Sequence, residues 1–472
     1  MGGLNFPNSA AMTDDSATPW YRLLNRHHWF VFIMASLAWM FDCLDQQLFN
    51  LARDSAMAQF FGKGSPEATK YGGIATAIFV AGWAMGGLIF GTVGDRVGRA
   101  RMLTITVLMY SLFTGLSAFS KGFVDFAVYR FITGLGVGGV FGLAVALVAD
   151  TLPDRARPHA LGLFQALSAV GNVTAALIAI VVGWMEATQR IRPGSSWSSL
   201  FLIGAAPAFL VVFIAWKMKE PEKWVRAREA GQKGGAKMGS YGELLGNARW
   251  SGRAWAGLVL CLSGVVGVWG IGFFSPKLIG DVLNRALASE VKPEEIDGYK
   301  TIWKGITLMM QNVGAFFGMM TFTKLAGRYG RKPVFAVAFL AALVSTFVCF
   351  RYLETRAQIF WMIPLMGFCQ MSLFAGYAIY LPELFPVNLR STGTSFCYNV
   401  GRFIAAAGPW TLGYLAVWLA KGSSDAAKLE GFRDACCWMS LIFLVGMAAL
   451  KFLPETKGRL LPEDEDAAAA AR

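Results

Sequence analysis

Residues 91–101 read GTVGDRVGRAR and join two long apolar runs, and residues 326–331, AGRYGR, join two others further along the chain. The glycines of both stretches allow a tight turn where two helices meet. Asp95 is placed to meet the positive N-terminus of another helix, while Arg96 and Arg99 can reach acidic groups or lipid headgroups. Two related turns of this kind indicate a helical unit that occurs twice.

The composition indicates that the chain is built for a bilayer. The 472 residues are 55% hydrophobic and only 15% charged, whereas soluble proteins carry about 25% charged residues. Apolar runs of ~20 residues, which suffice to cross a ~30 Å hydrocarbon core, recur along the whole length. Too many of these runs are apolar on every face for a soluble helical bundle. The sequence therefore predicts an all-α membrane protein surrounded by lipid.

We expect twelve membrane helices in two bundles of six. The expected spans are 29–51, 72–94, 102–120, 123–150, 159–187, 197–217, 253–280, 300–326, 333–352, 357–383, 391–419 and 431–453. The chain then divides into a cytoplasmic N-terminal segment, a first bundle, a cytoplasmic linker, a second bundle and a cytoplasmic tail, at 1–28, 29–217, 218–252, 253–453 and 454–472. The acidic and then Ala-rich stretch 463–472 is expected to be disordered.

An internal repeat supports this division. An acid, a proline and an arginine follow the fourth span and again the tenth, with the same separation for each pair: Asp150, Pro153 and Arg157, then Glu383, Pro386 and Arg390. The Pro-Glu pairs at 221–222 and 454–455 keep that separation. A near-constant register across half the chain indicates a duplication, and hence two pseudo-symmetric halves.

The formal charge of +13 is unevenly distributed. If the N-terminus is cytoplasmic and the helices alternate in direction, the inner segments hold more Lys and Arg than the outer loops. This positive-inside pattern predicts a protein of the cell inner membrane with both termini in the cytoplasm. It also argues against a nucleic-acid partner, and we expect a monomer.

The seven cysteines form no metal-binding pattern, and the sequence has no nucleotide-binding P-loop. We therefore expect no cofactor, no metal and no enzymatic activity. Any transport would have to be driven by ion gradients.

The stretch 91–101 resembles the signature loop of the major facilitator superfamily, and the elements at 221–222 and 454–458 resemble sugar-porter signatures, as does Arg130 with the glycines of span four. The resemblance implies a major facilitator fold in which this loop latches the two halves on the cytoplasmic side when the transporter opens outward. Residues expected at this cytoplasmic gate are Asp95, Arg96, Arg99, Asp150, Arg157, Glu222, Arg331, Glu383, Arg390 and Glu455. Because Gly327 stands where the second copy would carry the aspartate, we expect an asymmetric latch in which the first half dominates.

Span one carries two carboxylates, and a charged group at mid-bilayer costs about 3 kcal/mol. Asp42 and Asp45 share a helix face with Gln46. Asp42 and Arg130 have similar depths, about 13 Å and about 10 Å from the outer ends of their spans. We therefore expect an Asp–Arg pair between the first and fourth helices.

Such a pair can couple transport to protons. If substrate or helix motion removes Arg130, the desolvated carboxylate takes up a proton. The spacing of Asp42 and Asp45 resembles the motif of aromatic-acid:proton symporters, although Cys43 replaces its usual glycine, and proton-coupled sugar porters also pair a helix-one Asp with a helix-four Arg. A static ion pair that fixes helix register is the structural alternative.

Arg402 lies about 16 Å into span eleven, close to the midplane. No acidic residue of the second half has a comparable depth, so we expect Arg402 to face a cavity and bind an anion, because guanidinium matches carboxylate. The alternative is an arginine satisfied by helix-end carbonyls and neutral side chains. Other residues expected at the cavity are Asn399, Tyr398, Gln311, Asn312, Gln370, Asn172, Gln46, Trp269, Phe273 and Tyr377. Each of these could equally join helices to one another.

These observations predict a secondary active transporter that works by alternating access, with proton-coupled symport of a small organic anion such as an aromatic acid or a sugar acid. A proton-coupled sugar or polyol porter is the main alternative, favoured by the Pro-Glu-Thr-Lys-Gly element at 454–458 and by the abundant aromatic residues. A drug exporter and a non-transporting solute sensor are further alternatives, although the linker is too short for an added signalling domain.

Overall fold

The computed structural model describes residues 18–62, 65–271, 278–280, 282, 296–405, 408–422 and 424–463. All regular structure within these ranges is helical, which confirms the all-α prediction.

The helices of the first half and of the linker follow one another through short connections. They are η2 (Trp20–Leu23), α1 (Arg26–Phe61), α2 (Pro66–Val97), α3 (Arg99–Ser117), α4 (Phe123–Thr151), α5 (Arg157–Ala187), α6 (Ser196–Gly204), α7 (Ala208–Lys217), α8 (Glu222–Gln232) and α9 (Tyr241–Gly246).

The second half begins within the predicted linker and repeats the pattern of long helices. Its elements are α10 (Ala248–Val265), the π-helical turn η3 (Val266–Ile271), α12 (Ile296–Tyr329), α13 (Arg331–Tyr352), α14 (Arg356–Leu384), α15 (Arg390–Ala405), α16 (Gly408–Leu419), α17 (Asp425–Ser440), α18 (Ile442–Ala449) and η5 (Leu450–Phe452).

Within the described ranges, ten helices are long and apolar enough to cross a membrane by length and composition. They coincide with ten of the twelve predicted spans. The other two predicted spans correspond to α12, which carries Gln311 and Asn312 at its centre, and to α15 with α16. The α15 helix is polar along much of its length, and it is tolerated because nearly all of its residues are buried among other helices.

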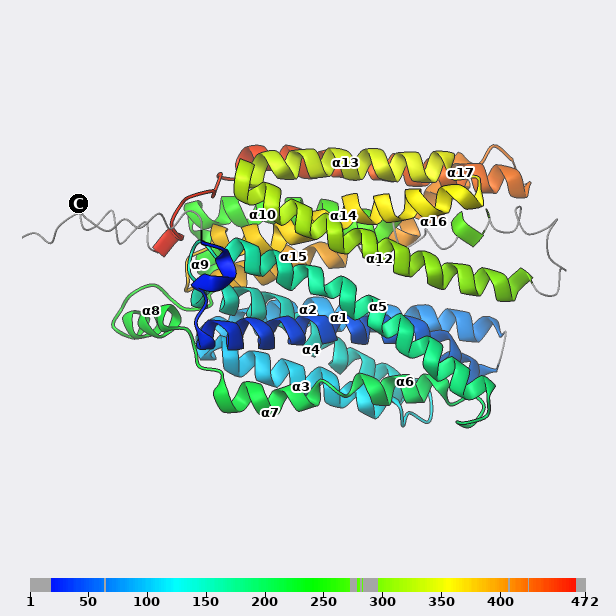
Figure 1. Ribbon diagram of the computed structural model, residues 1–472, viewed down its shortest axis with the longest axis horizontal. Coiled ribbons are helices and arrows are strands. Elements are labelled where there is room, and N and C mark those ends of the chain that lie inside the picture. The colour runs from blue at the N-terminus through cyan, green and yellow to red at the C-terminus, as the bar shows by residue number, and fades with distance from the viewer. Residues whose placement is uncertain are drawn as a thin grey trace, which may run out of the picture.

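The two halves lie side by side, and the axes of the long helices lie roughly along the long axis of the molecule (Figure 1). Contacts between the halves are made mainly by α5 with α12 and by α2 with α15. The short helices α8 and α9 lie at one end of the bundle, together with the turn between α2 and α3 (Figure 1). This end is called the linker end below.

Helices α2 and α4 approach closely at glycines. A Cβ atom on Gly138 would overlap the carbonyl oxygen of Trp83, and one on Gly82 would overlap the carbonyl oxygen of Phe131. Because no side chain separates the two backbones at these points, α2 and α4 pack closely against each other.

The seven cysteines are all free and all buried. Cys436 and Cys437 pack in the apolar cluster that joins α13, α14 and α17. Within the described residues, no group of His, Cys, Asp and Glu has the arrangement of a metal site.

Candidate functional site

The centre of the molecule holds one arginine between two aromatic rings. The guanidinium carbon of Arg402 on α15 lies 3.8 Å from the ring centroid of Trp83 on α2 and 4.3 Å from that of Tyr398. Its Nη1 donates to Oδ1 of Asn399 at 2.7 Å. The side chain is only 5% exposed, so cation–π contact replaces much of its lost hydration.

Among the described residues, Arg402 forms no direct ion pair, and the carboxylate that acts on it from a longer distance belongs to the opposite half. Arg402 interacts electrostatically with Asp42 of α1. The sequence argument sought a counter-charge for Arg402 only in the second half and did not consider Asp42 of the first. Nε of Arg402 and Oδ1 of Asp42 have no hydrogen-bond partner among the described residues. Oδ2 of Asp42 accepts from Nε2 of Gln46 at 3.0 Å.

The ion pair between the first and fourth helices involves Asp45 and not Asp42. Nη1 of Arg130 lies 3.9 Å from Oδ2 of Asp45, and both side chains are fully buried. Asp45 also accepts a 2.6 Å hydrogen bond from Thr114. The other nitrogens of Arg130 donate to hydroxyls of α3 and α4, namely those of Ser117, Thr114 and Thr133. The depth estimate selected the wrong aspartate because Asp45, one helical turn away, shares its face.

Aromatic rings from both halves surround Arg402. Tyr398 stacks on Phe141 of α4 with ring centroids 3.9 Å apart. Trp269, in the π-helical turn η3, meets Trp83 edge to face at 6.0 Å. Trp83 and Tyr398 thus contact the guanidinium directly, while Phe141 and Trp269 pack against those two rings. Phe273, expected at the same cavity, lies outside the described residues.

The remaining polar residues predicted at the cavity join helices to one another. Asn172 of α5 donates to Asn312 of α12 at 2.9 Å. Gln370 donates to Thr346 of α13 at 2.7 Å. Tyr377 donates to the carbonyl of Leu260 on α10 at 2.9 Å.

Gln311 marks the crossing of α12 with α14. Its backbone carbonyl packs closely against Gly367. Among the described residues, its side chain makes no hydrogen bond.

At the linker end, Asp95 of the first half meets the N-terminus of α15 in the second. Its Oδ2 accepts from the backbone N–H and the hydroxyl of Thr392, both at 2.8 Å, and its Oδ1 accepts from the N–H of Ser391 at 3.2 Å. The first-turn N–H groups of a helix have no partner within the helix and carry partial positive charge. A buried carboxylate of one half therefore caps a helix of the other.

A chain of charges runs from this cap to the C-terminal segment. Arg99 pairs with Asp95 at 2.9 Å and also with Asp150. Asp150 pairs in turn with Arg390 of the second half. The Nη2 of Arg390 donates to both carboxylate oxygens of Glu463, at 2.8 and 2.7 Å. Glu463, the first residue of the stretch expected to be disordered, thus has defined partners, and residues 464–472 lie outside the described residues.

The equivalent residues of the second half pair mostly within that half. Arg331 binds Glu383 at 2.7 Å, and Glu455 accepts from the backbone N–H groups of Arg331 and Lys332, both at 2.9 Å. Gly327, where an aspartate would stand by repeat symmetry, faces the ring of His159. The contacts between halves are therefore asymmetric here, with the cross-half carboxylate supplied by the first half.

The prediction that Glu222 lies at this gate is wrong. Its side chain is 88% exposed and, within the described part of the chain, its ion pair is with Arg226, also exposed, one turn further along α8. Glu220 takes the place instead, because it accepts from the backbone N–H groups of Arg99, Ala100 and Arg101 at 2.8 to 3.2 Å.

The two turns are built alike around these acids. Gly98 has φ +133° and lies against Glu220, as Gly330 has φ +103° and lies against Glu455. Positive φ is readily adopted only by glycine. The repeat register pointed to Glu222 because both carboxylates flank Pro221, and only the geometry separates them.

Two other gate candidates make local contacts. Arg157 donates to the carbonyl of Ala149 at 2.8 Å and pairs with Asp154. Arg96 is exposed and donates from Nε to the carbonyl of Gly239 in the linker at 2.9 Å.

Sequence reasoning also missed Trp83 and Asn388. A tryptophan in an apolar span has no distinguishing pattern. Asn388 lies between Pro386 and Arg390, both of which belong to the repeat, and that position was a signal that could have drawn attention to it.

The chain matches one protein-family model and is similar to proteins named as transporters and to a solved structure of a symporter. The family model described as Major Facilitator Superfamily matches residues 29–292. The chain is 28% identical over 402 residues to the cis,cis-muconate transport protein of Acinetobacter baylyi, covering 83% of this chain and 89% of that protein. It is 26% identical over 470 residues to the niacin transporter NiaP of Acinetobacter baylyi, covering 93% of this chain and 96% of that protein.

Among solved structures, the proton:xylose symporter XylE bound to 6-bromo-6-deoxy-D-glucose matches with a TM-score of 0.72 and 17% identity, covering 93% of this chain and 99% of that chain. A likeness at this level of identity shows a shared fold.

The two neighbouring acids Glu220 and Glu222 provide a matched test of the cap. Burial raises the pKa of Glu220, and the N–H groups of Arg101 and Ala100 oppose that rise. Replacing Glu220 by Ala leaves three backbone donors without this acceptor, and we expect it to cost about 1–2 kcal/mol of stability. Glu222→Ala should stay within about 0.5 kcal/mol of the native protein. Thermal unfolding of the two variants in detergent measures the difference, and equal losses would contradict the assignment.

Glu455 predicts a pH-dependent contribution to stability. Burial alone would raise its pKa, but the N–H groups of Arg331, Lys457 and Lys332 outweigh burial and lower it below the ordinary value of 4.5. A lowered folded pKa gives stability that is complete above the unfolded value and is lost as the pH falls through the folded value. The melting temperature of Glu455→Gln should therefore lie below that of the native protein at pH 7 and approach it as the pH falls below about 4.

The control for this measurement is Glu222→Gln, in which the removed charge is exposed. It should melt close to the native protein at every pH. A difference for Glu455→Gln that stays constant from pH 7 to below pH 4 would show that the carboxylate charge is not the cause.

Proposed function

Because the chain belongs to the major facilitator superfamily, and is therefore a multi-pass membrane transporter, we propose that it carries a small organic anion together with protons by alternating access. The single observation that carries this proposal is the buried Arg402, which is held between Trp83 and Tyr398 and interacts electrostatically with Asp42 of the opposite half.

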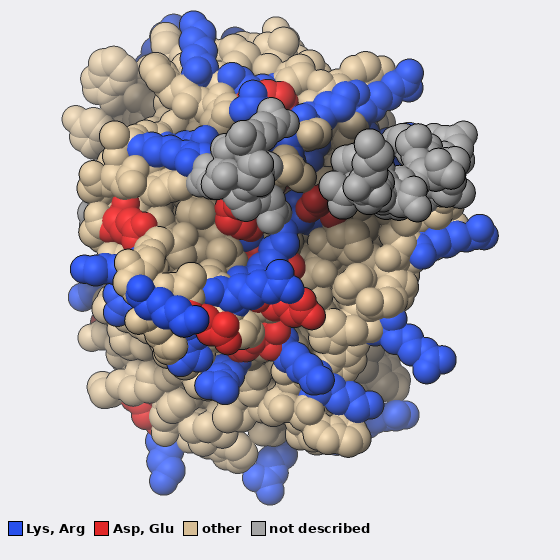
Figure 2. Space-filling model, turned by 90° about the vertical axis from the view of Figure 1, so that its left-hand side faces the viewer, with Lys and Arg blue, Asp and Glu red and all other residues tan. Residues whose placement is uncertain are grey.

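We propose that the protein acts as a monomer. We place the linker end in the cytoplasm, with both termini on that side of the cell inner membrane. The support is the positive-inside rule. Figure 2 looks at the linker end, where Lys and Arg project across the face and fewer Asp and Glu lie between them.

The substrate class follows from the chemistry of Arg402. A guanidinium offers a planar fork of donors that fits a carboxylate, and its Nε has no partner among the described residues. Rings on two sides suit a flat or conjugated acid, because aromatic faces stack on such groups. The relatives named for cis,cis-muconate and niacin point to the same class, since both compounds are carboxylic acids.

Coupling to protons would come from competition for Arg402. While Asp42 is ionised it neutralises the arginine, and an incoming anion has to displace it. When Asp42 takes up a proton, Arg402 is left without a counter-charge and favours a substrate carboxylate. Anion and proton then bind together, which is the requirement for symport.

The pair of Asp45 and Arg130 is a second position at which a proton could be held. Oδ2 of Asp45 and Nη1 of Arg130 face each other without a hydrogen bond to any described residue. A small movement of α4 relative to α1 would change this contact more than the tighter bonds to Thr114 and Ser117. The pair is suited to respond to helix motion during the transport cycle.

The linker-end contacts would act as the cytoplasmic gate. The cap of Asp95 on α15 and the bridge from Asp150 to Arg390 both cross between the halves. In this arrangement the cytoplasmic side is closed, and opening it requires both contacts to separate.

Arg402 is tested by ligand-induced stabilisation of the purified protein. Nicotinate and cis,cis-muconate should raise the melting temperature of the native protein, more strongly at low pH. Arg402→Ala should abolish the effect, because the guanidinium that would bind the carboxylate is gone. Gln370→Ala, which removes a buried amide that bonds to α13, is the matched control and should keep the response.

The outcome that would overturn the anion assignment is stabilisation by xylose or another neutral sugar that is unchanged in Arg402→Ala. The chain would then be a sugar porter in which Arg402 is structural.

Asp42 is tested by the pH dependence of binding. The affinity of the native protein for nicotinate should fall by up to about tenfold per pH unit above the point where Asp42 ionises, as expected for one linked proton. Asp42→Asn cannot compete for Arg402, so its affinity should stay high across the same range, and proteoliposomes containing it should lose substrate-driven proton uptake. Titration by isothermal calorimetry measures the first effect. An unchanged pH slope in Asp42→Asn would place the coupled proton elsewhere.

A further inference from the structure

We propose that the cavity between α2, α8 and the connection from α8 to α9 binds an anion that carries two or more phosphate groups, and that this ligand holds the linker-end gate closed. The cavity is separate from the central site of Arg402.

The cavity has a volume of about 620 Å³, which lies within the range of ligand sites, about 300–1,000 Å³. Its walls carry three cations from three separate elements: Arg96 from the end of α2, Arg228 from α8, and Lys237 from the connection that follows. Ser240 adds a hydroxyl and Met238 an apolar side chain. Cations that converge from separate elements on one cavity favour an anionic occupant.

The positive charges of these three side chains remain available to a ligand. Within the described part of the chain, none of them forms an ion pair with a carboxylate. Arg96 uses only its Nε, in the bond to Gly239, and the guanidinium of Arg228 lies 5.3 Å from the ring centroid of Trp224. Glu220 interacts electrostatically with Arg228 but already accepts three backbone N–H groups.

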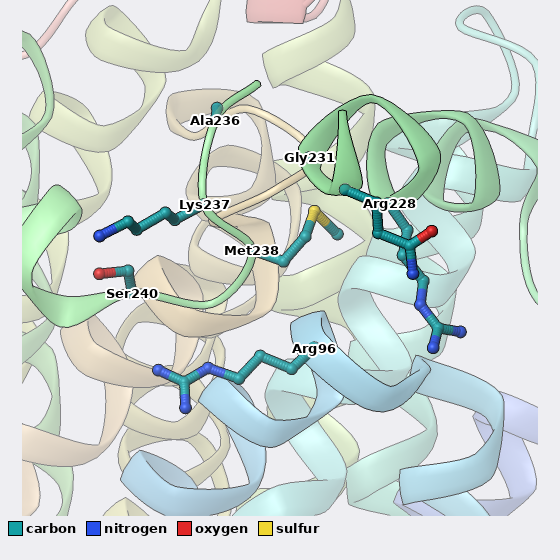
Figure 3. A pocket seen from close by; sticks show the side chains of 8 residues that line it. Arg96, Arg228, Gly231, Ala236, Lys237, Met238 and Ser240 are labelled. Atoms are coloured by element: carbon teal, nitrogen blue, oxygen red, sulfur yellow. The ribbon is translucent and has the colours of Figure 1, made fainter. Parts of the chain in front are cut away.

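The cations are placed at two points and not one. In Figure 3 the amine of Lys237 and the guanidinium of Arg96 extend to the same side as the hydroxyl of Ser240, while the guanidinium of Arg228 lies on the other side, with Met238 between them. A single carboxylate would engage one side only. Two linked phosphates could meet both, because phosphate oxygens accept from a guanidinium fork and from an ammonium group.

The wall of the cavity also joins the two halves. The carbonyl of Gly239 accepts from Arg96 of the first half, and its N–H donates to the carbonyl of Asn388 of the second half at 2.8 Å. The side chain of Asn388 donates to the carbonyl of Lys237 at 3.2 Å. A ligand bound by Arg96, Arg228 and Lys237 would hold this connecting segment in place, and so stabilise the closed gate by its preference for that state.

Such phosphates have two sources, a soluble di- or triphosphate compound and a lipid with two phosphates such as cardiolipin. The test uses the full chain in nanodiscs of phosphatidylcholine without transport substrate, so that its outcome does not depend on the proposed function. Inorganic pyrophosphate is the soluble probe, and melting temperature and calorimetric titration are the readouts. The variants are the double substitution Arg228→Gln/Lys237→Gln and the control Lys233→Gln, which removes an exposed linker lysine that does not line the cavity.

The proposal predicts that pyrophosphate stabilises the native protein and Lys233→Gln, and that the double variant binds about tenfold more weakly or less, since two of three cations are lost. Equal responses in all three proteins, or the same stabilisation by sodium sulfate at matched ionic strength, would overturn it.

Nanodiscs that contain cardiolipin distinguish the two sources. If cardiolipin stabilises the native protein but not the double variant, and removes the response to pyrophosphate, the ligand is a lipid. If the response to pyrophosphate is the same in both lipids, the ligand is soluble. A failure of every arm would refute the site and leave the role of Arg402 untouched.

Discussion

The structure depends on one constraint: a charge buried in the apolar interior needs a partner, and several of the partners come from the opposite half. Asp42 acts on Arg402 electrostatically, Asp95 caps α15, and Asp150 bridges Arg99 to Arg390. Breaking a buried pair by removing one member costs about 3–5 kcal/mol. The halves cannot simply separate, because each buried charge has to find a new partner or reach water as they move. Charge pairing therefore determines which arrangements of the halves are stable.

The two sets of charges differ in how completely they are satisfied. At the linker end Asp95 accepts several hydrogen bonds, and Asp150, although its Oδ2 has no hydrogen bond among the described residues, is ion-paired with two arginines. At the centre, Arg402 and Asp42 each retain an atom without a hydrogen bond to any described residue, as do Arg130 and Asp45. A fully satisfied network favours one state, whereas a partly satisfied one accepts a substrate or a proton. This contrast is consistent with the proposed roles of the linker end as a gate and of the centre as the binding site.

Much of the fold could be predicted because it rests on patterns that survive in one sequence. The repeat placed Gly98 and Gly330 in equivalent turns, and apolar runs located the helices. Three features could not be read in this way. The register of the repeat cannot tell Glu220 from Glu222, because only the direction of the chain after α7 decides which carboxylate meets the turn. Residue depth cannot tell Asp42 from Asp45, which share a helix face. The carboxylate that acts on Arg402 belongs to a helix far away in sequence, and only the three-dimensional structure brings the two residues into range.

The burial of all seven cysteines has a practical consequence. Thiols enclosed by packed helices react slowly with maleimide reagents, so labelling of the native cysteines should be low. A cysteine introduced at an exposed position, such as Lys233 in the linker, would carry a spin label or a fluorophore without prior removal of the native ones. Two such labels, one on α8 and one on the exposed outer face of α13, would report the distance between these two parts of the molecule. The buried core of the protein would remain unchanged.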